Sequence, residues 1–189
     1  MLTSILLLMR RSIAETFPIP EGVSCTYTEG TFHCAKGGNK LSRVIKVPQI
    51  TLEIKDKNIT LAARAGGKKE LTCIMSQKAH INNLFRGLAE EFVYHLEACN
   101  VHFPMTLKVE GDTLLINNFL GEKTPRKAHI VPGVKVDLKG PKVTLTGRNI
   151  EALGHTMANI ERATKVRNRD RRVFQDGIFL TERPGGIAA

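Results

Sequence analysis

The feature that most constrains the fold of this chain is an internal repeat. Residues 50–64, ITLEIKDKNITLAAR, align without a gap with residues 134–148, VKVDLKGPKVTLTGR, at a constant offset of 84 positions. Identical Lys, Thr, Leu and Arg residues recur at matching places in the two segments. Both segments alternate apolar and polar residues around a short polar turn, which is typical of a β-hairpin with one buried face. The sequence therefore predicts the same hairpin twice.

The repeat continues on both sides of these hairpins. Upstream, residues 26–34 and 107–116 predict a second hairpin in each copy, and both turn at Glu-Gly. Downstream, residues 76–96 and 149–165 carry apolar side chains at spacings of three and four, which predicts a helix in each copy. Asn149 is the expected N-cap of the second helix, because its side chain can accept hydrogen bonds from the first turn.

This order of elements predicts an α+β fold with two tandem duplicated domains, each a small antiparallel sheet packed on one face by a helix. The domains are expected to span 1–98 and 99–189, with the join near the His-Phe-Pro at 102–104. The alternative is a single eight-stranded domain whose hairpins merely resemble one another. The apolar segment at 2–8, LTSILLL, is too short to span a bilayer and is interpreted as a first strand. A mitochondrial presequence that starts with this segment is the alternative.

The charge of the chain indicates an anionic partner. Its 189 residues include 28 Lys and Arg against 18 Asp and Glu, a formal net charge of +10, which favours nucleic acid ahead of a membrane surface. Residues 162–172, RATKVRNRDRR, hold six cations against one acid, and NFLGEKTPRK at 118–127 holds three. A solvated basic face is the alternative. Aromatic residues make up only 5% of the chain, which favours folded RNA contacted through phosphates over stacked single strands.

The basic turn also has a counterpart in the first copy. GGNKLSR at 37–43 and LGEKTPR at 120–126 share a Gly-x-Lys-x-x-Arg spacing. We therefore expect both domains to present an equivalent loop.

Signals for enzymatic or metal chemistry are weak. The segment 25–34, with two Cys and one His, matches no compact zinc spacing, and Cys99 with His102 lacks the Gly-rich context of a catalytic nucleophile. Residues 66–69, GGKK, lack the spacing of a phosphate-binding P-loop and are interpreted as a mobile basic loop. The four cysteines are interpreted as reduced thiols in the cytosol or nucleus. We expect no enzyme, no cofactor and no metal.

Three motifs resemble a known family. NFLGEK at 118–123, Pro-Gly-Val at 132–134 and TKVRNRDRRVFQDGIF at 164–179 look like the ribosomal large-subunit protein six family, in its eukaryotic and archaeal branch. The resemblance implies a structural component of the cytoplasmic ribosome, assembled in the nucleolus if eukaryotic. It would bind large-subunit rRNA beside neighbouring ribosomal proteins, near the translation-factor-binding region, with no membrane or small-molecule substrate. The alternative is a free regulatory RNA-binding module acting off the ribosome.

The resemblance and the repeated spacing together suggest which residues contact rRNA. The expected rRNA-binding residues are Lys123, Arg126, Lys127, Lys165, Arg167, Asn168, Arg169, Arg171, Arg172, Lys40 and Arg43.

Overall fold

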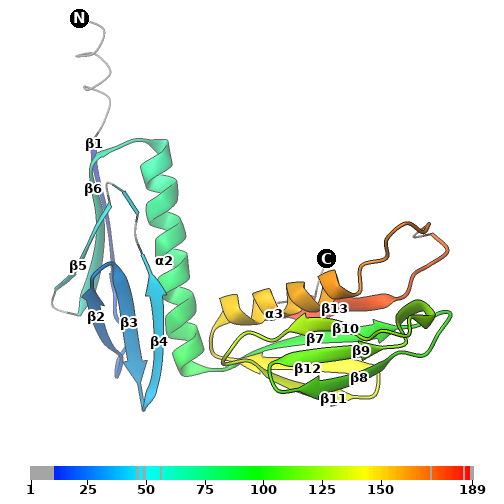
Figure 1. Ribbon diagram of the computed structural model, residues 1–189. Coiled ribbons are helices and arrows are strands. Elements are labelled where there is room, and N and C mark those ends of the chain that lie inside the picture. The colour runs from blue at the N-terminus through cyan, green and yellow to red at the C-terminus, as the bar shows by residue number, and fades with distance from the viewer. Residues whose placement is uncertain are drawn as a thin grey trace, which may run out of the picture. The chain divides into compact units, whose positions relative to one another are not determined.

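The computed structural model describes residues 11–184, 186 and 187, apart from positions 46, 49, 56 and 171. The first strand expected at 2–8 lies outside these described residues. The chain divides into two compact units, Met1–Ala89 and Glu90–Ala189. Both units combine small antiparallel sheets with a helix, so the predicted α+β class is confirmed (Figure 1).

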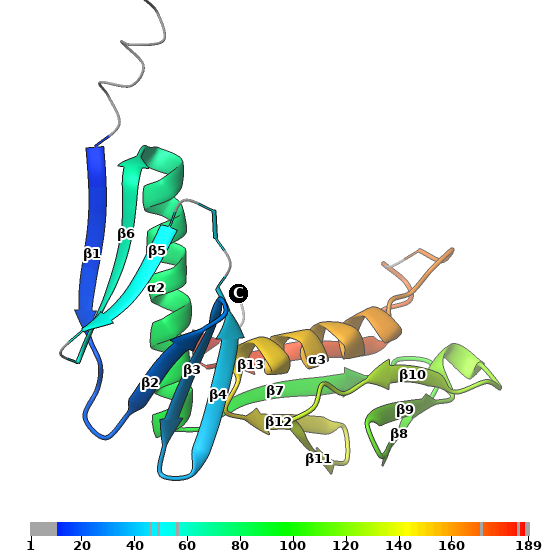
Figure 2. The same cartoon turned by 60° about the vertical axis from the view of Figure 1, so that its left-hand side comes forward.

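The first unit contains two three-stranded sheets and a long helix. Its elements are β1 (Arg11–Pro18), β2 (Ser24–Thr28), β3 (Thr31–Lys36), β4 (Asn39–Val44), β5 (Ile50–Lys55), β6 (Asn58–Gly66) and α2 (Lys68–Ala89). One sheet has the order β1-β6-β5 and the other β2-β3-β4, with antiparallel neighbours throughout (Figure 2). Helix α2 packs on β6, β3 and β4. Its buried Ile81 and Phe85 share one core with Phe32 and Leu61 of the sheets.

The second unit has a similar plan with additional strands. Its elements are β7 (Phe92–Cys99), β8 (Thr106–Glu110), β9 (Thr113–Asn117), the short 3-10 helix η1 (Phe119–Gly121), β10 (Arg126–His129), β11 (Lys135–Lys139), β12 (Lys142–Gly147), α3 (Ile150–Ala163), β13 (Gly177–Arg183) and β14 (Gly186–Ile187). The sheets have the orders β11-β12-β7-β13-β14 and β10-β9-β8. Helix α3 packs on β10, β12, β13 and β7.

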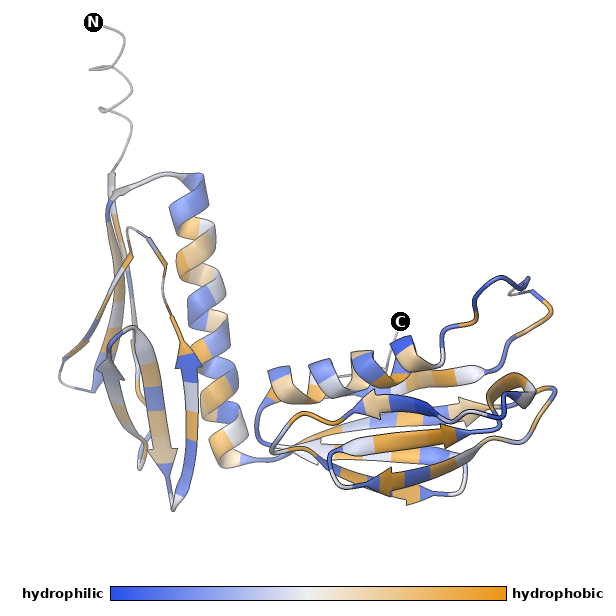
Figure 3. Cartoon of the chain, in the orientation of Figure 1, coloured by the Kyte–Doolittle hydropathy of each residue, from blue (hydrophilic) through white to orange (hydrophobic). Residues whose placement is uncertain are grey.

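The core of the second unit follows from strand periodicity. Along β7, Phe92, Tyr94 and Leu96 are buried at alternate positions, and β12 buries Val143 and Leu145 in the same way. These side chains form one cluster with buried residues of β9 and α3. The loop between α3 and β13 is coloured mostly hydrophilic in Figure 3. The buried residues of β7, β9, β12 and α3 therefore form the core, and the loop between α3 and β13 is mostly polar.

All four predicted hairpins are confirmed, as β2–β3, β5–β6, β8–β9 and β11–β12. The prediction of one sheet in each unit is wrong. The two hairpins of a unit lie in separate sheets, and each hairpin pairs with one additional strand that the sequence did not predict. The strands β1 and β7 pair with β6 and β12, and β4 and β10 pair with β3 and β9. Each unit therefore contains two small sheets in place of the predicted one.

The predicted helix at 76–96 is correct up to residue 89 and wrong beyond it. Helix α2 begins at Lys68, and it ends at Ala89, where β7 soon follows. From Phe92 to Cys99 the residues alternate between buried and half-buried or exposed, which is the period of a strand. The predicted boundary at 98/99 falls inside β7, whose partners β12 and β13 both belong to the second unit.

The start of α3 agrees with the prediction, whereas the start of α2 does not. Asn149 caps α3, because its side chain accepts hydrogen bonds from the backbone N–H groups of Glu151 and Ala152 at 3.0 and 3.4 Å. The interpretation of 66–69 as a mobile loop is wrong. Gly66 ends β6, the Gly67 N–H donates to the Glu70 carboxylate at 2.7 Å, and the following lysines begin α2.

Candidate nucleic-acid interface

The chain turns sharply between β9 and β10, in the NFLG segment. Asn118, Leu120 and Gly121 have φ angles of 58°, 50° and 77°. A branched side chain such as that of Leu120 adopts this left-handed conformation only where its surroundings enforce it. The two residues before Leu120 are fixed in place. The Asn118 side chain donates a hydrogen bond to the carbonyl of Pro104 at 3.0 Å, and the Phe119 side chain is fully buried. The segment is therefore a defined turn that is anchored to the core.

Arg126 joins this turn to the end of α3. Its Nε and Nη2 donate to the two carboxylate oxygens of Glu122 at 2.8 and 2.6 Å. Its Nη1 donates to the carbonyls of Ala163 and Lys165 at 2.9 and 3.1 Å. The guanidinium carbon also lies 4.2 Å from the centre of the Phe119 ring. These bonds use four of the five N–H donors of a guanidinium, so Arg126 is part of the internal structure of the unit.

The charge of Glu122 is stabilised by the same contacts. The hydrogen bond from Arg126 lowers the pKa of Glu122, partial burial opposes this shift, and the charges of Arg126 and Arg169 lower the pKa further. The carboxylate is therefore ionised at neutral pH. The effect of Arg169 also shows that the loop after α3 lies near the turn.

Hydrogen bonds that Thr164 and Asp170 accept from backbone N–H groups organise the loop after α3, residues 164–176. Thr164 is buried at the end of α3, and its hydroxyl accepts from the backbone N–H of Ile178 at 3.1 Å, which joins the helix end to β13. The carboxylate of Asp170 accepts from the backbone N–H of Arg172 at 2.9 Å. The loop therefore has a defined path although most of its side chains are exposed.

Asp176 fastens the far end of this loop. Its carboxylate is buried and accepts hydrogen bonds from the backbone N–H groups of Val101 and His102 at 2.8 and 3.1 Å, and it pairs with the His102 ring at 2.9 Å. Burial raises the pKa of Asp176, but the bonds from His102 and Val101 outweigh burial, so the pKa lies below its usual range. Phe174 stacks on His102 at 4.9 Å, and the guanidinium of Arg169 lies 4.7 Å from the Phe174 ring centre. Arg169 is thereby held in place.

The remaining expected residues of this unit are mostly exposed. Lys123 lies between η1 and β10, and Lys127 lies on β10. The exposed residues of the loop after α3 are Lys165, Arg167, Asn168, Arg169 and Arg172. Arg171 lies outside the described residues.

A basic pocket of about 320 Å³ brings the two cationic segments together. It is lined by Arg126, Lys127, Arg162, Ala163 and Arg167. Arg126 directs its donors at Glu122 and backbone carbonyls, so Lys127, Arg162 and Arg167 supply the available charge. No carboxylate of the described residues forms an ion pair with these three side chains. Convergent arginines of this kind suit a phosphate group, because the planar guanidinium matches its oxygens.

Arg162 is a residue of this pocket that sequence reasoning did not include among the expected contacts. It lies in the last turn of α3, where a cation is accounted for by the helix dipole. The signal that could have found it is its position at the start of the basic run 162–172.

In the first unit, Lys40 and Arg43 lie on β4, so the loop predicted for 37–43 is wrong over most of its length. Lys40 is exposed, whereas Arg43 is half-buried. Burial lowers the pKa of Arg43, and burial together with the charge of Arg43 lowers the pKa of His80 on α2. Arg43 is therefore directed towards the helix of its own unit.

The two cysteines of the segment 25–34 lie on strands of the first unit. Cys25 and Cys34 lie opposite each other on β2 and β3. Burial raises the pKa of Cys25 to about 11, and burial with the charge of Cys25 raises that of Cys34 to about 12. Both are thus protonated at neutral pH, and a protonated thiol is a poor metal ligand. Within the described ranges, no three His, Cys, Asp or Glu side chains are grouped for metal binding, and no helix could cross a membrane.

Comparison with known proteins identifies the family. Residues 103–177, which include the turn and all five lining residues of the basic pocket, match the family described as ribosomal protein L6. The large ribosomal subunit protein uL6 of Methanobrevibacter smithii is 42% identical over 169 residues, which cover 89% of this chain and 95% of that protein. This chain belongs to the ribosomal protein L6 family.

Two further relatives agree. Proteins of the same name from Methanosphaera stadtmanae and Methanococcus vannielii are 41% and 37% identical over 172 and 175 residues. These alignments cover 90% and 93% of this chain and 94% and 96% of the relatives. The expected family is confirmed. Because the family consists of ribosomal proteins, the expectation of a non-enzymatic chain is confirmed with it.

Proposed function

We propose that the chain is a structural constituent of the large ribosomal subunit that binds large-subunit rRNA. In this proposal it lies near the translation-factor-binding region of the cytoplasmic ribosome, beside neighbouring ribosomal proteins. Family membership supports the assignment to a ribosome, and the names of the relatives support the large subunit. The net charge of +10 supports a polyanionic partner.

The observation that carries the RNA-binding proposal is the basic pocket. Lys127 on β10 meets Arg162 and Arg167, which lie at least 35 residues further along the chain, around one hollow. A merely solvated surface would gain nothing from gathering three like charges, which repel one another unless an anion lies between them. A phosphate of the RNA backbone would remove that repulsion and release bound counterions.

The proposed contacts differ in role. Those proposed to face rRNA are Lys123, Lys127, Arg162, Lys165, Arg167, Asn168, Arg169, Arg172, and Arg171 outside the described residues. Arg126 is proposed to support them by fixing the turn to the helix end. Lys40 is proposed as a contact of the first unit, and Arg43 as a weaker contact because it is half-buried.

We also propose that the two units arose by duplication, as two tandem domains. The orders β1-β6-β5 and β2-β3-β4 recur as β7-β12-β11 and β8-β9-β10. The pairs that close the two long hairpins, Lys55 with Asn58 and Lys139 with Lys142, lie 84 positions apart, as the sequence repeat requires.

Sedimentation tests the ribosomal role. We expect the tagged protein, expressed in the organism that encodes it, to migrate with large subunits on sucrose gradients. It should stay bound through a moderate salt wash. Replacing Lys127, Arg162 and Arg167 with Gln should release it at lower salt. The matched control replaces Lys108, Lys135 and Lys139, three exposed cations on β8 and β11, and should behave as wild type. Recovery of the wild-type chain only from ribosome-free fractions would overturn the proposal.

A further inference from the structure

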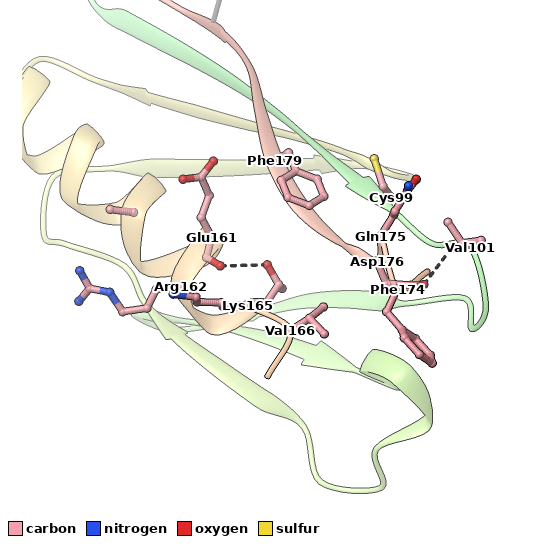
Figure 4. A pocket seen from close by; sticks show the side chains of 12 residues that line it. Cys99, Val101, Glu161, Arg162, Lys165, Val166, Phe174, Gln175, Asp176 and Phe179 are labelled. Carbon is pink, nitrogen blue, oxygen red and sulfur yellow. Dashed lines mark hydrogen bonds between the residues drawn. The ribbon is translucent and has the colours of Figure 1, made fainter. Parts of the chain in front are cut away.

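A second, larger pocket lies beside the basic pocket in the same unit. It has a volume of about 790 Å³ and lies between the end of α3, the end of β7 and the start of β13. Arg162 lines both pockets, so they are neighbours that share one side chain. Figure 4 shows the side chains of Glu161 and Phe179 directed into the same space. A pocket of this size accommodates a nucleoside-sized group.

An aromatic ring is available at this pocket. Phe179 is 43% exposed, unlike the fully buried Phe32 and Phe119. The ring packs against Gly177, where an added Cβ would lie 2.7 Å from the Phe179 Cζ. Because Gly177 has no side chain, the end of the ring can lie directly over the backbone at this position. Phe174 also lines the pocket, but it is already in contact with His102 and Arg169. Phe179 is therefore the ring on which a planar ligand can stack.

The polar groups around the ring distinguish between ligands. Arg162 and Lys165 line the pocket, and within the described part of the chain neither forms an ion pair with a carboxylate. Glu161 also lines it, with one carboxylate oxygen accepting from the Leu180 N–H at 3.1 Å. A carboxylate repels phosphates and acidic peptides, but it accepts hydrogen bonds from the amino groups of nucleobases. The cations in turn suit the phosphate that such a base carries.

We propose that this pocket takes one unstacked nucleobase of the RNA, stacked on Phe179, with its phosphate at Arg162 and the adjoining basic pocket. The inference rests on the proposed binding of rRNA and adds a base-contacting site to it. The sugar-phosphate backbone would pass over Arg162, which separates the pocket for the base from the pocket for the phosphate. Glu161 would select bases that present an amino group.

Filter binding with Phe179→Ala tests the site, with large-subunit rRNA purified from Methanobrevibacter smithii as the probe. Loss of one stacked base should weaken binding roughly 5- to 100-fold. The slope of log affinity against log salt should stay the same, because no cation is lost. Phe179→Tyr should bind as wild type. Phe103→Ala is the matched control, because Phe103 is also 43% exposed but does not line the pocket, and it should stay within roughly twofold of wild type.

Ultraviolet crosslinking of the wild-type complex gives a second measurement that does not depend on a variant. Nucleotide adducts should map by mass spectrometry to Phe179 or to Cys99, an exposed thiol that lines the pocket. Adducts found only elsewhere would overturn the inference, as would equal losses for Phe179→Ala and Phe103→Ala. Unchanged rRNA affinity with lost binding to ribosomal proteins would assign the pocket to a protein partner instead. If the wild-type chain bound no rRNA, the proposed function would fail first.

Discussion

Arg126 and Lys127 are adjacent basic residues that the structure assigns to different tasks. Replacing Arg126 with Lys keeps the charge but removes the planar fork that bridges Glu122 and the carbonyls of Ala163 and Lys165. A hydrogen bond of this kind contributes about 0.5–1.5 kcal/mol. The partly exposed pair with Glu122 contributes about 0.2–1 kcal/mol. A lysine would retain some of these contacts, so we expect the free energy of unfolding to fall by about 2 kcal/mol.

This loss is measurable in two ways. Scanning calorimetry should show a Tm lower by roughly 10 °C for the transition of the second unit. Hydrogen exchange followed by mass spectrometry should show amides of 119–126 and 163–165 exchanging up to roughly 30-fold faster, which corresponds to the same free energy. Exchange in α2, which belongs to the first unit, should be unchanged.

The control for Arg126→Lys is Lys127→Met, because the Lys127 side chain is exposed and, among the described residues, forms no hydrogen bond or ion pair with the helix end. This variant should preserve the Tm and weaken rRNA binding. The reasoning fails if Arg126→Lys unfolds and exchanges like wild type but loses rRNA affinity as strongly as Lys127→Met. That result would make Arg126 a direct phosphate contact.

Three further changes test other contacts of the second unit. Replacing Lys123 and Lys127 with Gln should reduce the slope of log affinity for rRNA against log salt by about 0.7–0.9 per lost phosphate contact, whereas an unchanged slope would mean that both face solvent. The lowered pKa of Asp176 contributes stability above pH 3.8 that is lost as the pH falls; Asp176→Asn should lower the Tm at pH 7 and flatten its decline in acid. Thr164→Val should cost about 1–3 kcal/mol in urea unfolding by leaving the buried Ile178 N–H without its acceptor, and Thr164→Ser should not.

The sequence predicts the hairpins well because their signal is local. Each hairpin has alternating apolar residues and a turn rich in Gly, Asn or Lys, and no distant contact is needed to define it. The cap at Asn149 is equally local, since the side chain bonds to N–H groups two and three residues ahead. Four-residue β10 is different. Its sequence, RKAH, has little strand character, and it becomes a strand by pairing with β9.

The error at the end of α2 has a similar cause. Leu88 and Phe92 are four positions apart, so their spacing fits one face of a single helix. It fits equally well a helix that ends just after Leu88 and a strand that begins at Phe92. The pairing of β7 with both β12 and β13 decides between these alternatives. The paired residues of those strands lie at least 45 positions further along the chain, beyond the reach of a local pattern.

The shared Gly-x-Lys-x-x-Arg spacing aligns two arginines that have different surroundings in the structure. It aligns Arg43 with Arg126 and also aligns Asn39 with Glu122. A carboxylate can accept two hydrogen bonds from one guanidinium, and a neutral amide oxygen offers a weaker acceptor without the opposite charge. With Glu122, Arg126 is fixed across the turn to the helix end; with Asn39, Arg43 lies on a regular strand and is directed towards α2. The repeat therefore locates the arginine, but the local conformation, a turn between Glu122 and Arg126 and a strand between Asn39 and Arg43, decides which groups the arginine can reach.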